Sequence, residues 1–159
     1  MAHSILVAYF SATGTTARVA ERLAKAADAD LVEIRPAEPY TPADLDWRDK
    51  RSRSSVEMND PHARPKLAVK PKVGRYDTVF IGFPIWWYTA PAIIKTYLEA
   101  ADFTDKVIVL FATSGGSGMG DTLENLVDCA PDAWWLDAER FDANVSAAEL
   151  AAWVQDLEL

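Results

Sequence analysis

The chain has 159 residues, of which 50% are hydrophobic and 25% charged, and this composition suits one folded domain with a full core. A single cysteine, Cys129, excludes an internal disulfide and a cysteine-based metal cluster, and with only two histidines we expect no metal site. No apolar stretch reaches the ~20 residues of a membrane span and no secretion signal is recognisable, so we expect a protein of the cytoplasm without membrane association.

The net charge of −8 is unevenly distributed along the chain. Residues 77–159 carry −11, whereas the first 76 residues carry +3. Nucleic-acid binding needs a basic face, and most of this surface has the opposite sign, so we expect no nucleic-acid partner. The acidic surface serves either solubility or docking to basic partner proteins.

Short apolar runs rich in Val, Ile and Phe predict strands, each ending at turn residues, at 4–10, 29–34, 77–83 and 106–112. Their near-continuous apolar character is typical of strands covered on both faces, as in a parallel sheet. A fifth strand is predicted at 133–141.

Amphipathic patterns predict helices between and after these strands, at 15–27, 90–101, 121–130 and 146–159. Ser146 and Glu149 form a capping-box pattern at the start of the last helix. Cys129 lies on a helical pattern and is interpreted as a small buried hydrophobe rather than a redox group. Strand and helix alternate, which predicts a single doubly wound α/β domain with three layers.

One segment, residues 36–72, breaks this alternation, and we call it the excursion. Its charges are dense and mixed, and it is rich in proline at positions 36, 39, 42, 61, 65 and 71. Thr41 is placed to cap a short helix that starts at Pro42, and Trp47, Met58, Leu67 and Val69 give the segment something to bury. We interpret it as an ordered excursion over the surface, with a disordered linker as the alternative.

The loop after the first strand is rich in hydroxyl groups, and we call residues 11–16 the hydroxyl loop. It consists of Ser11, Ala12, Thr13, Gly14, Thr15 and Thr16. A helix N-terminus with unpaired N–H groups holds phosphate well, and one of these threonines is expected to cap the helix. The loop lacks the Lys of a Walker A loop and the three glycines of a dinucleotide fingerprint, which favours a monophosphate. The alternative is an ordinary capped turn.

Two later loops fall at strand carboxyl ends, on the same predicted rim of the sheet. The aromatic loop, residues 84–90, contains Pro84, Ile85, Trp86, Trp87 and Tyr88. Three adjacent aromatic residues in a connection suit stacking on a flat ligand, although they could also anchor a core or an interface. The glycine-rich loop, residues 113–120, offers backbone groups and small side chains to the polar edge of a ring system, at Thr113, Ser114, Gly115, Gly116 and Gly118. By itself its composition is that of any flexible loop.

The three loops in this order resemble the flavodoxins, over the whole chain. "YFSATGTT" is similar to the flavodoxin phosphate loop, and "GFPIWWYTAP" and "TSGGSG" to the two loops that flank the flavin. The resemblance implies a five-stranded sheet of order 2-1-3-4-5 and FMN as a noncovalent cofactor, and it is closest to a subgroup with a "PIWW" loop and a charged excursion. It implies an electron carrier with no catalytic side chain, in which Trp87 or Trp86 stacks on the flavin.

Two other functions fit the same resemblance. "FPIWWYTAPAIIKTYLE" is also similar to flavin-dependent quinone reductases, so an NAD(P)H-dependent quinone or flavin reductase is the alternative to a carrier. Only Lys95 and the arginines of the excursion, at 48, 51, 53 and 64, are candidates to hold a nucleotide phosphate. A more distant interpretation is an FMN-linked scaffold. The oligomeric state stays open.

Overall fold

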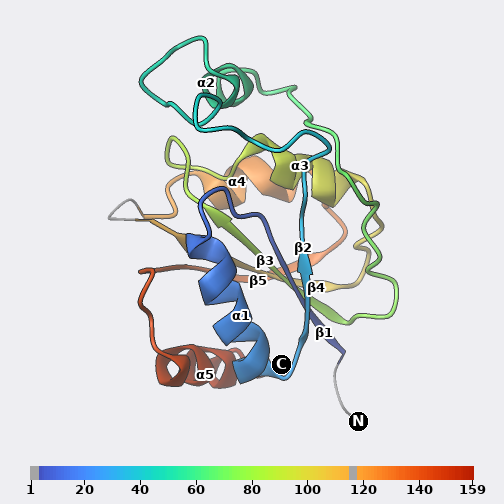
Figure 1. The fold of residues 1–159 in the computed structure, drawn as a ribbon. Helices are drawn as coiled ribbons and strands as arrows, with labels where there is room; N and C mark the ends of the chain where they lie inside the picture. The colour runs from blue at the N-terminus through green and yellow to red at the C-terminus, as the bar shows by residue number, and fades with distance from the viewer. Residues whose placement is uncertain (1–3, 115–117) are drawn as a thin grey trace.

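The computed structural model of the chain describes residues 4–114 and 118–159. Strands and helices alternate along most of the chain (Figure 1). The strands are β1 Ile5–Tyr9, β2 Asp30–Glu33, β3 Thr78–Pro84, β4 Val107–Thr113 and β5 Trp134–Phe141. The helices are α1 Thr15–Ala27, α2 Arg53–Met58, α3 Ala92–Glu99, α4 Thr122–Val127 and α5 Ala147–Asp156.

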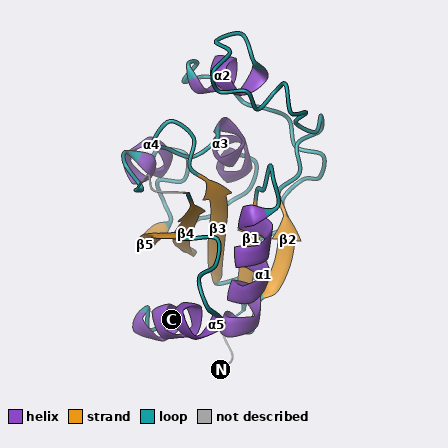
Figure 2. Cartoon of the chain, turned by 60° about the vertical axis from the view of Figure 1, so that its left-hand side comes forward, coloured by secondary structure: helices purple, strands orange, loops and turns teal. Residues whose placement is uncertain are grey.

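The five strands form one parallel sheet in the order β2-β1-β3-β4-β5, as the sequence analysis predicted. Helices α1 and α5 cover one face, α3 and α4 cover the other, and α2 stands apart from the sheet (Figure 2). The fold is therefore the predicted doubly wound sandwich of three layers.

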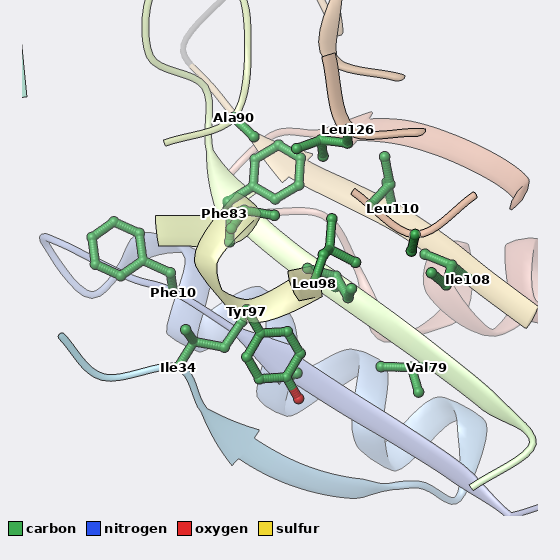
Figure 3. Close-up of a cluster of buried hydrophobic side chains, with 14 of the residues drawn as sticks. Phe10, Ile34, Val79, Phe83, Ala90, Tyr97, Leu98, Ile108, Leu110 and Leu126 are labelled. Carbon is green, nitrogen blue, oxygen red and sulfur yellow. The ribbon is translucent and has the colours of Figure 1, made fainter. Parts of the chain in front are cut away.

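Alternate residues of each strand point to opposite faces, so the sheet has two cores. On the α3 and α4 side, Leu98 packs with Ile108 and their neighbours in a buried cluster (Figure 3). On the α1 and α5 side, Leu23 and Leu150 pack on a second cluster that includes Phe80. Burial on both faces explains the continuous apolar runs of the central strands.

The prediction that β2 is covered on both faces is wrong. All four of its residues are exposed, including Leu31 and Val32 at 41% each. β2 is exposed because it is an edge strand of the sheet. The excursion that follows it runs away from the sheet and does not cover it (Figure 1).

The excursion is ordered and contains a helix, but not the predicted one. Thr41 caps residues 42–45 as predicted, because its Oγ1 accepts a hydrogen bond from the Asp44 N–H at 3.1 Å, but these residues form a turn and not a helix. Helix α2 begins after Ser52, whose hydroxyl accepts a hydrogen bond from the Ser55 N–H. Of the four apolar residues expected to be buried in the excursion, two are exposed instead, Trp47 at 68% and Val69 at 56%. Its return segment pairs with residues just beyond β2, where the Ala68 N–H donates to Arg35 O at 2.8 Å.

The remaining boundaries differ from prediction mainly at helix ends. Helix α4 stops at Val127, three residues short of the predicted end, and α5 stops at Asp156. Ser146 caps α5 as predicted, because its Oγ accepts a hydrogen bond from the Glu149 N–H at 3.1 Å. Cys129 is half-buried, and burial raises the pKa of its thiol, which agrees with a structural residue more than with a redox group.

Candidate functional site

The three loops singled out in the sequence lie together at the carboxyl edge of the sheet. Strands β1, β3 and β4 are parallel neighbours, so their carboxyl ends meet at one rim. Thr113, at the end of β4, is joined to both other loops. Its Oγ1 forms a hydrogen bond with Thr16 Oγ1 at 2.7 Å, and its carbonyl oxygen accepts one from the Ile85 N–H at 3.1 Å. Residues almost one hundred positions apart therefore build one site.

The hydroxyl loop makes a tight turn into α1, and its hydroxyl groups have two different roles. The Gly14 N–H donates to Ser11 Oγ at 3.0 Å, and the Thr16 side chain is buried against Thr113. Thr13 is exposed and Thr15 half-exposed, so their hydroxyl groups are the ones that can reach a ligand. Ala12 instead packs against the core.

The expected threonine cap of α1 is wrong. The residue before the helix is Gly14, which has φ 93° and makes no side-chain capping bond. This left-handed backbone favours glycine, and it leaves the first N–H groups of α1 without a side-chain cap. The result strengthens the loop as an anion site, since those N–H groups remain available.

Arg18 is a site residue that the sequence analysis missed. It lies one turn into α1, its N–H donates to Gly14 O at 3.2 Å, and an added Cβ at Gly14 would lie 3.7 Å from one of its guanidinium nitrogens. The hydroxyl loop contains no cation, but this guanidinium lies beside it. Arg18 follows Gly14 by four positions, which places the two residues one helical turn apart on the same side. This spacing could have identified Arg18 in the sequence.

The aromatic loop is a tight hairpin turn with Trp87 and Tyr88 at its centre. Trp86 and Thr89 exchange two backbone hydrogen bonds, of 2.9 and 3.0 Å. Trp87 has φ 49° and Tyr88 φ 63°, the positive values of a type I′ turn, which normally selects Asn and Gly. Trp87 is 42% exposed and Tyr88 68% exposed. Two of the three adjacent aromatic residues of this loop therefore face solvent.

Trp86 is half-buried and packs in a cluster of aromatic rings. It meets Phe10 and Tyr40 edge to face, with ring centroids 5.7 and 5.6 Å apart. Tyr40 comes from the excursion, and its hydroxyl donates to Glu57, which also pairs with Arg53 at 3.0 Å. Burial, and then the hydrogen bond to Glu57, raise the pKa of Tyr40 far above its ordinary value. The excursion is thereby fastened to the aromatic loop.

The described part of the glycine-rich loop is held by a residue from β5. Arg140 donates to Ser114 Oγ at 2.8 Å and to Ser114 O at 3.1 Å, and it pairs with Asp142 at 2.7 Å. Arg140 has no counterpart in the prediction, because only the register of β5 on β4 brings it to this rim.

The predicted residues Gly115 and Gly116 lie outside the described residues. Gly118 is exposed, and the nearby Gly120 approaches the aromatic loop closely. An added Cβ at Gly120 would lie 2.3 Å from the Tyr88 carbonyl oxygen. The glycine is therefore needed for the close approach of these two loops.

Half of the arginines proposed to hold a nucleotide phosphate are already engaged. Arg53 pairs with Glu57 and stacks on the Tyr40 ring at 3.9 Å, and Arg64 binds both oxygens of Glu99 at 2.6 and 3.2 Å. Within residues 4–114 and 118–159, no cluster of three metal-ligating side chains occurs, and no helix is long and apolar enough to cross a membrane.

The model of one protein family, described as Flavodoxin, matches residues 4–157. The chain belongs to the flavodoxin family. This confirms the resemblance predicted from the three loops.

Solved structures place this flavodoxin-family chain among flavoproteins. A candidate flavoprotein from Bacteroides eggerthii is 50% identical, with a TM-score of 0.94 and coverage of 99% of both chains. A second, from Bacteroides uniformis, is 46% identical, with a TM-score of 0.92 and coverage of 98% of this chain and 99% of that one. A flavoprotein from Lactobacillus acidophilus in complex with FMN shares the fold at 21% identity, with a TM-score of 0.69 and coverage of 87% and 93%.

One curated relative matches part of the chain. It is an uncharacterized NAD(P)H oxidoreductase, YcaK, from Escherichia coli, 29% identical over 83 residues. The match covers 52% of this chain and 38% of the relative, so this chain spans well under half of the length of that protein.

Proposed function

We propose that this protein binds FMN noncovalently and transfers electrons through it. The observation that carries the proposal is the convergence of three loops at one rim, joined by the Thr16 to Thr113 and Ile85 to Thr113 hydrogen bonds. The FMN complex of the Lactobacillus acidophilus relative, which has the same fold, supports this choice of cofactor.

Each loop suits one chemical part of FMN. The uncapped N-terminus of α1, the hydroxyl groups of Thr13 and Thr15 and the Arg18 guanidinium suit the phosphate. The exposed Trp87 ring suits the flat isoalloxazine, and the backbone near Ser114 suits its polar edge. FMN supplies the redox chemistry when it is bound, whereas these residues bind the cofactor, orient it and shield it from water.

The phosphate assignment is tested by removing the two accessible hydroxyl groups. Replacing Thr13 and Thr15 with Ala removes two donors worth about 1 kcal/mol each, so we expect FMN affinity to fall by roughly 30-fold. Riboflavin lacks the phosphate, and its affinity should stay within about twofold. Titration of the flavin-free protein, followed by flavin fluorescence, measures both constants.

The control for this experiment is Thr104→Ala, an exposed threonine at the amino end of β4, on the opposite rim. It should leave both affinities unchanged. If the Thr13 and Thr15 variant binds FMN as tightly as wild type, the hydroxyl loop does not hold the phosphate.

We favour an electron carrier over an enzyme, because the acidic second half of the chain suits docking to basic redox partner proteins. The second candidate is an NAD(P)H-dependent quinone or flavin reductase. Arg48 and Lys50, which line a cavity together with Trp87, favour it, and the NAD(P)H oxidoreductase name of the curated relative supports it.

Anaerobic mixing of the FMN-loaded protein with NADPH or NADH separates the two candidates. A carrier keeps its oxidised flavin absorbance until dithionite is added. A reductase loses that absorbance with a rate that saturates as the nucleotide concentration rises. Saturable bleaching by either nucleotide would replace the carrier with the reductase.

A further inference from the structure

An open cavity of about 650 Å³ lies between the excursion and the aromatic loop. Its volume falls within the range of small-molecule sites, ~300–1,000 Å³. Five of its lining residues come from the excursion and one from the aromatic loop, namely Trp47, Arg48, Lys50, Ser55, Asn59 and Trp87.

Two indole rings line this cavity from opposite segments. Trp47 is 68% exposed and Trp87 is 42% exposed, although tryptophan is usually well buried. Two large aromatic side chains left exposed around one cavity mark a surface for a flat apolar partner. Trp87 also has a strained backbone with positive φ. Backbone strain of this kind is concentrated at ligand-binding and active sites, which supports a binding role for this cavity.

The charged residues of the cavity are both cations. Neither Arg48 nor Lys50 forms an ion pair with any residue in the two described ranges, 4–114 and 118–159. The Arg48 guanidinium lies over the Trp47 ring, 5.6 Å from its centroid, which holds it near the aromatic surface. The excursion carries eight Lys and Arg against six Asp and Glu, a local excess of positive charge on a chain of net charge −8.

Polar groups complete the lining. Ser55 is only 2% exposed, and its Oγ accepts a hydrogen bond from Ser52 Oγ at 3.0 Å. The Asn59 Nδ2 donates to Ser55 O at 2.8 Å, which orients the Asn59 amide. Asn59 thus contributes a polar amide to the lining, and the buried Ser55 holds that amide in place.

We infer that this cavity binds a flat aromatic compound that carries one carboxylate or sulfonate group. The two indoles provide stacking surfaces, and Arg48 and Lys50 provide the charge for the acid group. The inference rests on the proposed function only in one respect, that the bound compound lies against the loop assigned to the flavin. Binding itself does not require FMN.

The test uses 2-naphthoate and its uncharged analogue 2-naphthamide as probes, with binding to the full chain measured by calorimetry. Wild-type protein should bind the anion at least about tenfold more tightly than the amide. The variant R48Q/K50Q should lose about tenfold in affinity for 2-naphthoate and little for 2-naphthamide. Trp47→Leu should weaken both probes.

The matched control is K70Q/K72Q, which removes two other cations of the excursion that line a different cavity, beside β2. It should bind 2-naphthoate like wild type. Equal losses in the two double variants would show nonspecific attraction and overturn the inference, as would the absence of binding to wild-type protein.

Repeating the titration with and without saturating FMN separates this inference from the proposed function. Unchanged 2-naphthoate affinity, or tighter binding, supports a separate site beside the flavin. Displacement of 2-naphthoate by FMN would make the cavity part of the cofactor site and overturn the inference. A protein that binds 2-naphthoate but not FMN would retain this site and refute the FMN proposal.

Discussion

Thr16 and Thr113 are buried polar residues that connect the hydroxyl loop to the end of β4. They are 1% and 3% exposed, and their hydroxyl oxygens are 2.7 Å apart. A buried hydroxyl without a partner is costly, so each threonine depends on the other. Their contact explains why a loop rich in hydroxyl groups does not present all of them to a ligand.

We expect Thr113→Val to lower the free energy of unfolding by about 1–3 kcal/mol, because it leaves the Thr16 hydroxyl buried without its partner. The double variant with Thr16→Val should recover most of that loss, since it removes both polar groups. Urea unfolding of the four proteins in the double-mutant cycle measures the coupling. Additive losses would show that the two hydroxyl groups do not depend on each other.

Trp87 and Tyr88 occupy backbone positions that bulky residues rarely adopt. Their positive φ values belong to a turn that Asn and Gly form without strain. Trp86, the residue before Trp87, packs in an aromatic cluster with Phe10 and Tyr40. The adjacent tryptophans therefore differ in role, since Trp86 supports the loop and Trp87 faces outward.

Replacing Trp87 with Asn and Tyr88 with Gly should raise the free energy of unfolding by about 1 kcal/mol or more, because it relieves strained residues. An indole stacked on the isoalloxazine quenches flavin fluorescence. The same change should therefore raise the fluorescence of bound FMN, because it removes the Trp87 indole. Trp86→Ala is the contrast and should lower stability. A loss of stability in the double variant of Trp87 and Tyr88 would contradict the strain assignment. Unchanged flavin fluorescence would contradict the stacking assignment.

Among the elements, the excursion departs furthest from a regular α/β crossover. It leaves β2 exposed at the sheet edge and holds α2 away from the sheet (Figures 1 and 2). Tyr40 is its inner anchor, and the Arg64 to Glu99 pair fastens it to α3. The excursion is thus an ordered segment that is attached to the domain through Tyr40 and Arg64, and not a flexible linker.

Stability should decrease at alkaline pH because of the Tyr40 anchor. The pKa of Tyr40 is raised in the folded state by burial and by the Glu57 carboxylate, so the unfolded chain loses this proton first. The stabilisation is complete below the ordinary pKa of about 10 and is lost as pH rises above it.

We therefore expect the free energy of unfolding, measured with urea between pH 8 and 11, to decline less steeply with pH in Tyr40→Phe than in wild type. The difference should reach up to about 1.4 kcal/mol per pH unit above pH 10. Tyr97, whose pKa is also raised by burial, contributes to the decline in both proteins. Identical slopes would mean that Tyr40 ionises as easily in the folded protein as in the unfolded chain.

For the whole molecule, charge is divided between two regions. Residues 77–159 carry −11, whereas the excursion carries a positive excess close to the aromatic loop. The first region suits a basic partner protein and the second a small anion. The balance between these two regions bears directly on whether the protein is a carrier or a reductase.

If the protein is a carrier, electron transfer from its reduced form to a basic acceptor such as cytochrome c should slow markedly as salt rises. At about 0.5 M salt the Debye length is only a few Å, so the attraction between the acidic surface and its partner is screened. Stopped-flow absorbance measures this rate. An uncharged quinone is the control acceptor, and its rate should not change with salt. Equal salt dependence for both acceptors would remove the acidic surface from docking.

The sequence by itself determined the fold class and the approximate place of the site. Central strands of a parallel sheet are buried on both faces, and this burial leaves a continuous apolar run that can be recognised directly. The carboxyl ends of such strands share one rim, so the loops after β1, β3 and β4 could be assigned to one site before their contacts were known. Family resemblance then supplied the strand order and the cofactor.

Tertiary structure decided what each residue of the site does. Trp86 and Trp87 are adjacent residues of the same type, and the turn between Trp86 and Thr89 leaves the first half-buried and the second exposed. Arg140 reaches Ser114 only through the register of β5 on β4. Tyr40 meets Trp86, nearly fifty residues away along the chain, because the start of the excursion packs against Phe10 and the aromatic loop. Such contacts depend on long-range packing, which local sequence patterns do not encode, because a pattern records the period of one element and not the position of the next.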